Sequence, residues 1–239
     1  MITFFRKIRQ GLLKDMKIGK YILYAMGEIL LVVIGILIAL QINNWNSRQI
    51  EKKEEKKSYM NIRQQVVDDK KELLQVKAFN TYFTTAYERA SQIISKKEHT
   101  KTDSLALITM GLSQYSDFHR AANIYESLVN SGELGLLKNS RITSALQKLE
   151  TTYIFVNKLE DMHWGLIINE LSAELKGVIN YSSFELVKPE KLYSVELQNI
   201  YFEIINLCKG KDIVYQQAIS EIDSIIGLIN QEVAIPDAN

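Results

Sequence analysis

The sequence is poor in residues that break helices or cross-link chains. It has two prolines and one cysteine in 239 residues, and its first proline is Pro189. A single cysteine cannot form an internal disulfide, so no disulfide framework holds this fold. Between Trp45 and Gly111 there is neither proline nor glycine. This scarcity of helix breakers predicts long helices.

A basic excess is also missing. The chain has 29 Lys plus Arg against 28 Asp plus Glu, a formal net charge of +1. Nucleic-acid binders use an excess of basic side chains to neutralise phosphates, so the composition argues against that class. The charge is nevertheless uneven along the chain. Residues 1–20 carry six basic side chains and one acidic one, a net +5, so the rest must carry −4 to give the total of +1.

Motifs for catalysis or for phosphate binding are absent as well. The sequence contains no GxGxxG, GxxxxGK[ST], GxSxG or HExxH pattern. His99, His119 and His163 have no second ligand at helical metal-binding spacing, and Cys208 has no neighbouring histidine. We therefore expect no metal, no cofactor and no enzymatic activity. A hydrolase whose site is assembled from distant residues is the remaining enzymatic alternative.

A long hydrophobic run follows the basic arm. Residues 22–42 read ILYAMGEILLVVIGILIALQI, and only Glu28 and Gln41 among them are strongly polar. A helix of this length spans roughly 30 Å, the thickness of the hydrocarbon core of a bilayer. Tyr21 and Trp45 lie where aromatic rings settle at the two membrane interfaces. These features predict a transmembrane helix over residues 21–44.

A cleaved signal peptide is the alternative, but its apolar region would be shorter and would end in a small-x-small cleavage site, which ALQINNWN does not supply. Six basic residues precede the run and five follow it closely, so the positive-inside count favours a cytoplasmic N-terminus by only one. The first helix usually sets the orientation, and long domains are translocated largely regardless of charge. We therefore expect residues 1–20 to form a cytoplasmic arm and the C-terminal region to lie outside the cytoplasm.

One side of the predicted transmembrane helix carries a distinctive stripe around Glu28. At 100° per residue, the other members of this packing stripe are Tyr24, Val32, Gly35, Ala39 and Ile42. Gly35 and Ala39 form a small-xxx-small pair, which permits close helix approach. The stripe predicts helix packing, with Glu28 as an intramembrane functional candidate that responds to protons or ions or binds another subunit. A glutamate that reaches toward the headgroups near Lys20 is the alternative.

The region after Trp45 predicts an all-α domain. Residues 45–58 are expected to form a charged helical connector, with a flexible tether as the alternative. Between Tyr59 and Ile94, steps of three and four residues select 11 positions, of which nine are apolar or aromatic, and so predict one long amphipathic helix. The fold class is therefore all-α: one N-terminal transmembrane helix followed by an antiparallel helical bundle over residues 59–235.

Further helices are predicted on the same grounds. Their expected ranges are from Thr102 or Asp103 to Ser113, 117–131, from Asn139 or Ser140 to about 180, 193–208 and 212–231, the last two separated at Lys209-Gly210-Lys211. The apolar face of the third range is expected to comprise Ile142, Leu146, Leu149, Tyr153, Val156, Leu159, Trp164 and Ile167. The stretch YESLVNSGELGLLKN reads as a tight connection docked by leucines, with an exposed recognition turn as the alternative.

Three stretches carry a resemblance to other proteins: MITFFRKIRQGLL, KYILYAMGEILLVVIGILIALQINNWN and YESLVNSGELGLLKN. They resemble an uncharacterised family of small single-pass membrane proteins from Bacteroidota, a domain-of-unknown-function family. The resemblance is strongest over residues 1–46 and shorter over 125–139. It implies residence in the inner membrane of a Gram-negative envelope with a helical soluble region. It implies no activity and no catalytic residues.

Together these features predict a membrane-anchored, oligomeric, helical periplasmic module that scaffolds a larger envelope complex or acts as its sensor. Its expected partners are the lipid bilayer, further copies of the chain and an envelope protein. The alternative is an oligomeric ion channel or a proton-coupled membrane component in which several copies bring Glu28 together.

Overall fold

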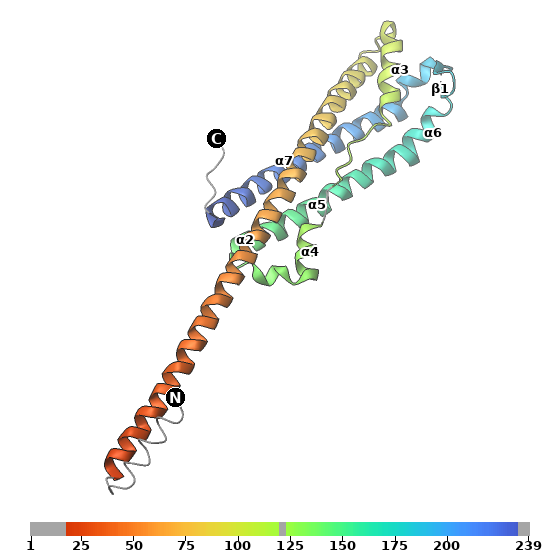
Figure 1. The fold of residues 1–239 in the computed structure, drawn as a ribbon. Coiled ribbons are helices and arrows are strands. Elements are labelled where there is room, and N and C mark those ends of the chain that lie inside the picture. The colour runs from red at the N-terminus through yellow and green to blue at the C-terminus, as the bar shows by residue number, and fades with distance from the viewer. Residues whose placement is uncertain (1–17, 120–122, 234–239) are drawn as a thin grey trace. The chain divides into compact units, whose positions relative to one another are not determined.

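The structure is a computed structural model that describes residues 18–119 and 123–233. Most of the predicted basic arm and the side chain of Tyr21 lie outside the described part. The chain divides into two units, Met1–Glu54 and Glu55–Asn239. Helix α2 runs without a break from Ile18 to Ser95 and contributes to both (Figure 1). Residues 45–58, the expected connector, are helical throughout.

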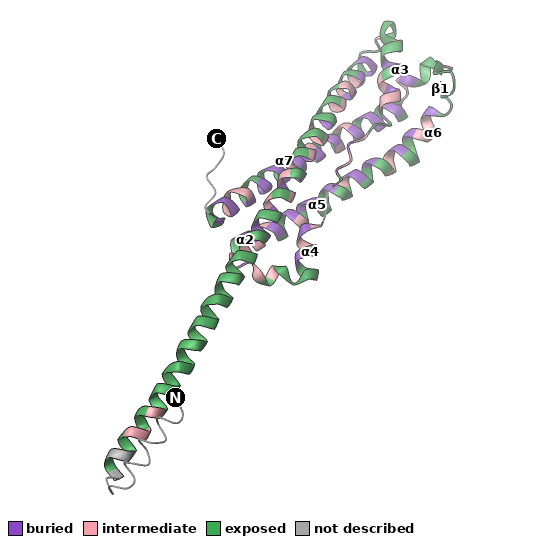
Figure 2. Ribbon diagram, in the orientation of Figure 1, coloured by how far each residue is buried: buried purple, intermediate pink, exposed green. Residues whose placement is uncertain are grey.

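In the first unit, α2 presents the long apolar run. From Ile22 onward this helix is long and apolar enough to cross a membrane, by length and composition. Figure 2 shows the run as exposed along nearly its whole length. Between Ile22 and Ile42 the large apolar side chains apart from Tyr24 are 46–76% exposed. An apolar surface of this extent needs a cover that the polypeptide does not supply in the described residues.

The second unit is a helical bundle with four arms. The first arm is the part of α2 from residue 55 to residue 95. The others are formed by α3 (Thr102–Gly111) with α4 (Ile124–Ser131), by α5 (Ser140–Leu166) with η3 (Ile167–Leu171) and α6 (Ser172–Leu175), and by α7 (Val195–Val233). The connections contain η1 (His99–Lys101), η2 (Glu133–Leu136), η4 (Pro189–Tyr193) and the antiparallel strands β1 (Ile179–Asn180) and β2 (Glu185–Leu186).

Hydrogen bonds between arms set their directions. Early in the first arm, Arg63 donates to Asn230 near the end of α7 (2.9 Å). Later in the same arm, Asn80 donates to the carbonyl of Cys208, nearer the start of α7 (2.8 Å). The two helices are therefore antiparallel. The second arm carries the chain back along the bundle, so α5 runs in the same direction as α2 (Figure 1).

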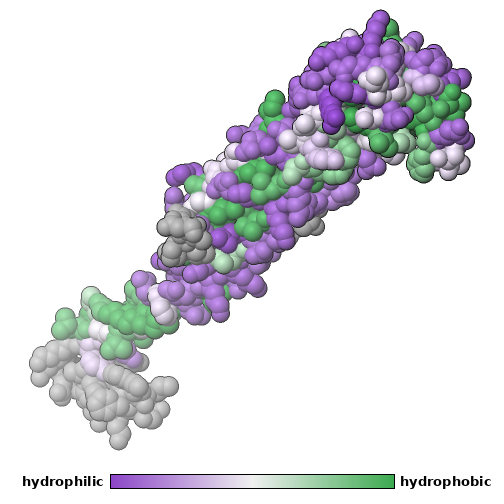
Figure 3. Space-filling model, turned by 90° about the horizontal axis from the view of Figure 1, so that it is seen from above, coloured by the Kyte–Doolittle hydropathy of each residue, from purple (hydrophilic) through white to green (hydrophobic). Residues whose placement is uncertain are grey.

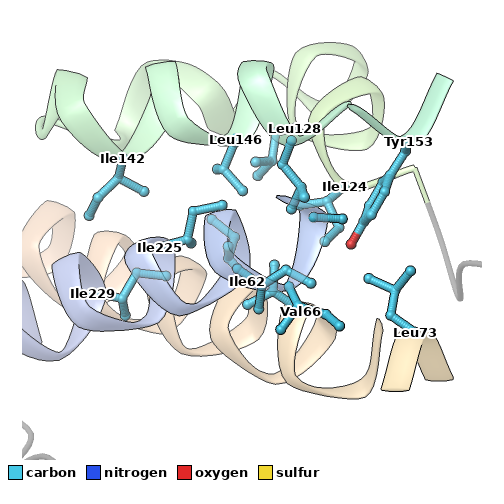
Figure 4. Close-up of a cluster of buried hydrophobic side chains, with 14 of the residues drawn as sticks. Ile62, Val66, Leu73, Ile124, Leu128, Ile142, Leu146, Tyr153, Ile225 and Ile229 are labelled. Atoms are coloured by element: carbon cyan, nitrogen blue, oxygen red, sulfur yellow. The ribbon is translucent and has the colours of Figure 1, made fainter. Parts of the chain in front are cut away.

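Two apolar clusters fill the bundle, because buried positions recur at steps of three and four along each helix. The first cluster joins α2, α4, α5 and α7 through residues such as Ile62, Val66, Leu128, Ile142, Leu146, Ile225 and Ile229 (Figure 4). The second joins the other end of α2 to α3, η3, α6 and α7 through Tyr87, Ile94, Leu105, Leu171, Leu175 and Tyr201. The predicted all-α class is confirmed, and all 11 stripe positions from Tyr59 to Ile94 are buried or half-buried.

Three predicted helix boundaries are wrong. The break at Gly210 does not occur: α7 is continuous, because Cys208 and Lys211 both occupy the buried face and their packing outweighs the cost of about 1 kcal/mol for one helical glycine. The predicted helix at 117–131 begins only at Ile124, where Asn123 caps α4 by accepting from the N–H of Glu126. The predicted helix that ends near 180 stops at Leu175, before the β1–β2 hairpin.

The connection between α4 and α5 is confirmed as a tight turn docked by leucines. Gly132 ends α4 with φ of +75°, a conformation that favours glycine because it has no Cβ. Leu137 is buried, and Leu134 is half-buried against the first cluster. Asn139 then caps α5, as predicted, by accepting from the N–H of Arg141 (3.0 Å).

Leu73 and Leu74 offer a matched test of the packed face. Leu73 is 0% exposed and Leu74 is 49% exposed. Because Leu73→Ala leaves a cavity in the first cluster, we expect the free energy of unfolding to fall by about 2–5 kcal/mol. Leu74→Ala should change it by less than about 0.5 kcal/mol. Urea denaturation followed by circular dichroism measures both, and equal losses would contradict the assignment of the faces.

Candidate functional site

The residues of the predicted packing stripe all lie on the uninterrupted helix α2, so their helical spacing is real. Val32, Gly35, Ala39 and Ile42 are exposed in the first unit, and Tyr24 and Glu28 are half-buried. A Cβ added to Gly35 would meet nothing within 4 Å. Trp45, the predicted interface anchor, is 62% exposed. The described residues therefore leave the part of the stripe from Val32 to Ile42 open to a second helix.

The second unit contains a cluster that the sequence did not reveal, centred on residues 112–119. This non-helical segment, here called the strap, joins α3 toward α4. Its buried backbone groups have no helical partners and need others. Glu160 of α5 accepts from the N–H of Phe118 (3.0 Å), and Lys211 of α7 donates to the carbonyl of Ser116 (3.2 Å). Ionisable side chains from two helices thus hold the strap.

Six buried side chains, here called the polar layer, surround this contact, and none is more than 3% exposed: Asn80, Ser116, Glu160, His163, Lys211 and Tyr215. The hydroxyl of Tyr215 lies 2.5 Å from Oε1 of Glu160 and 3.0 Å from Oγ of Ser116. Ser116 donates to Oδ1 of Asn80 (3.2 Å). Hydrogen bonds therefore run continuously from α5 through α7 and the strap to α2.

Lys211 and His163 are the two basic side chains of the polar layer. Nζ of Lys211 lies 2.9 Å from Nδ1 of His163 and 6.0 Å from the centre of the Tyr115 ring. Burial lowers the pKa of Lys211. Burial, and then the charge of Lys211, lower the pKa of His163 to about 3, so His163 is neutral at pH 7. An ammonium group can only donate, so a charged Lys211 makes Nδ1 the acceptor and leaves the histidine proton on Nε2.

Glu160 is the acidic member of the polar layer. Burial raises its pKa to about 7, although the hydrogen bond from Tyr215, the charge of Lys211 and the N–H of Phe118 oppose this rise. Removing a carboxylate from water disfavours its charged form, which explains the direction. Burial and the neighbouring Glu160 also raise the pKa of the Tyr215 hydroxyl, which therefore stays protonated as a donor. The charge of the polar layer thus changes near neutral pH.

The polar layer separates the two apolar clusters. Along α5, Val156 belongs to the first cluster and Ile167 to the second, with Glu160 and His163 between them. Of the predicted apolar face, Leu159 is half-buried against the first cluster, but Trp164 is wrong, since it is 48% exposed. The steps of three and four from Leu149 lead through Glu160 and His163 to Ile167. This spacing was the signal in the sequence that Glu160 and His163 are buried. A search of the helix face for apolar residues alone misses them.

An apolar pocket of about 400 Å³ lies beside the polar layer. Ten residues line it: Met110, Ser113, Trp164, Ile167, Ile168, Leu171, Ser172, Leu175, Tyr181 and Phe184. The ring of Tyr115 lies 5.4 Å from that of Trp164 and 5.9 Å from that of His163, and so contacts both sites. Figure 3 shows hydrophobic surface gathered at the end of the domain where α6 and β1 lie in Figure 1.

The polar layer and the pocket differ in their access to solvent, and this difference determines the chemistry that each can perform. Glu160 and Lys211 are bonded to backbone groups of the strap, Tyr215 to the side chain of Ser116, and His163 to Lys211. These buried groups therefore act on the protein itself. Among the described residues, no group of three or more His, Cys, Asp or Glu is placed to hold a metal ion. The pocket, by contrast, is open and apolar. The second unit is therefore a helical bundle with an internal proton-binding layer and one adjoining apolar pocket.

The chain belongs to a family of unknown function, DUF6090, whose model matches residues 28–207. The match covers most of α2, the strap and the pocket residues, and it ends within α7. It includes residues 28–46 and 125–139, where the sequence resemblance was seen, but not residues 1–27. No curated protein and no solved structure matches the chain.

Glu160→Gln tests the electrostatics of the polar layer, because glutamine can still accept from Tyr215 and Phe118 but cannot ionise. The folded-state pKa of about 7 lies above the ordinary 4.5. The stability that the protonated carboxyl contributes is therefore complete below pH 4.5 and is lost as the pH rises through 7. From pH 5 to 8 we expect the unfolding free energy of the wild type, relative to the variant, to fall by roughly 1–3 kcal/mol.

Urea titrations of both proteins at four pH values measure this difference. His163 and Lys211 titrate in both proteins, so to first order their contributions cancel. A difference that stays constant with pH would contradict the raised pKa of Glu160.

Proposed function

We propose that this protein is a single-pass membrane protein whose helical domain serves as a periplasmic interaction or sensor module of the bacterial inner membrane. The exposed apolar run of α2 carries this proposal. Its large aliphatic side chains face outward on all sides, and a hydrocarbon environment stabilises such a surface, whereas water does not. Residues 22–42 also have the length of a bilayer-spanning helix.

The construction of the second unit supports an interaction or sensor role rather than catalysis. The buried ionisable groups of its polar layer are bonded to the strap or to one another. A catalytic group must reach a substrate, and none of the six side chains of the polar layer is more than 3% exposed. Hydrophobic surface at the end of the domain offers a contact site instead.

The packing stripe supports self-association. Without a hydrophobic driving force inside a bilayer, helices associate through close packing at small residues. Gly35 and Ala39 supply such a surface, which is exposed in the first unit. The second candidate, an ion channel or proton-coupled component, is favoured by Glu28 alone. Copies that pack along this stripe would bring their Glu28 carboxyl groups toward one axis.

Topology is tested by fusing alkaline phosphatase, which is active only outside the cytoplasm, after Asn239. We expect an active fusion, because the basic N-terminal arm holds that end of the helix in the cytoplasm. A green fluorescent protein fused at the same point should be dark. An inactive phosphatase together with a fluorescent fusion would reverse the topology.

Self-association is tested by cysteine cross-linking in membranes, in a background where Cys208 is replaced by serine. Gly35→Cys and Ala39→Cys lie on the stripe, and both should give disulfide-linked dimers on mild oxidation. Leu37→Cys is the matched control, since it points about 200° away from Gly35. No dimer at any of the three positions, with a strictly monomeric mass in detergent, would refute the oligomer.

A further inference from the structure

We propose that the apolar pocket is a binding site for an uncharged, mostly hydrocarbon small molecule. This inference goes beyond the proposed anchoring and interaction role, and it does not depend on the membrane topology. It rests on the shape of the pocket, the chemistry of its walls and the exposure of its rim.

The pocket is concave and assembled from three separate stretches of chain. Met110 comes from the end of α3 and Ser113 from the start of the strap. The residues from Trp164 to Leu175 come from the end of the third arm, and Tyr181 and Phe184 come from the β1–β2 hairpin. Its volume of about 400 Å³ falls in the range of small-molecule sites, about 300–1,000 Å³.

A π-helical turn forms one wall. The N–H of Ser172 bonds to the carbonyl of Ile167, five residues back, rather than four as in an α-helix. Ile167 and Leu171 of this turn, and Leu175 after it, are buried on the inner face. Ile168, which follows Ile167 in the turn, lines the pocket and is 49% exposed.

The walls determine which ligand fits. None of the ten lining residues is charged, and aliphatic and aromatic side chains dominate. An ionised ligand would lose water here without gaining a partner, at a large cost in free energy. The hydroxyl groups of Ser113, Ser172 and Tyr181 can satisfy one or two polar groups of a neutral ligand. A molecule with a hydrocarbon body and a hydroxyl, ester or amide group matches this set.

The rim is exposed where a ligand would cover it. Phe184 is 71% exposed and Tyr181 is 51% exposed, although both are large and apolar in part. The hairpin holds Phe184 at φ of +56°, a conformation that a phenylalanine rarely adopts. Burying these rings under a neutral ligand removes apolar surface from water and so stabilises the complex.

Photoaffinity labelling of the full chain in lipid nanodiscs tests the proposal, with a diazirine-bearing dodecanol as the probe. Digestion and mass spectrometry then locate the labelled residues. We expect saturable labelling of the peptides that contain Trp164, Ile168, Tyr181 and Phe184, and competition by unlabelled dodecanol. The matched diazirine-bearing dodecanoate, which is ionised at pH 8, should label the same peptides at least about tenfold more weakly.

Two variants complete the test. Ile168→Glu places a charge in the pocket and should weaken dodecanol binding at least about tenfold, whereas Ile154→Glu, on the exposed face of the same arm, should leave it unchanged. Circular dichroism and the melting temperature show whether each variant is folded. Labelling that does not saturate, that spreads evenly over exposed apolar residues, or that persists in a folded Ile168→Glu variant would overturn the proposal. Equal labelling by the alcohol and the carboxylate would overturn the requirement for a neutral ligand.

Discussion

The architecture of the second unit depends on how the backbone of the strap is hydrogen bonded. One arm of the bundle is not helical over residues 112–119, yet Ser116 and Phe118 in this stretch are buried. A backbone group that is buried without a partner costs free energy comparable to a lost hydrogen bond. Glu160 and Lys211 supply the missing partners. Their presence on helix faces that are mostly apolar is explained by this need.

The polar layer has a cost as well as a use. Buried charges lose their hydration, and a buried ion pair is often no more stabilising than an apolar replacement. What the layer adds is specificity, because Asn80, Glu160 and Lys211 are satisfied only when α2, α5, α7 and the strap meet at one level. A slip of one helix along another would leave these buried groups without partners, which is costly.

The polar layer and the apolar pocket are neighbours through Tyr115 and Trp164. The ring of Tyr115 contacts His163 and Trp164, and Trp164 lines the pocket. A ligand that moves Trp164 therefore acts on Tyr115, whose ring also faces Lys211 and His163. Ser113 of the strap also lines the pocket, so the two sites share a segment of chain.

The sequence alone determined the features that depend on local periodicity: the apolar run of α2, the 11-position stripe from Tyr59 to Ile94, the cap at Asn139 and the turn at Gly132. Steric and hydrogen-bonding preferences over a few residues suffice for these. The helix break expected at Gly210 failed because packing of the buried face overrode a local preference. Glu160, His163 and Lys211 were missed because a polar side chain on an apolar face is explained only by its partner, and here the partners are 42–95 residues away in the chain. The pocket was invisible for the same reason, since only the tertiary structure brings α3, the π-helical turn and the hairpin together.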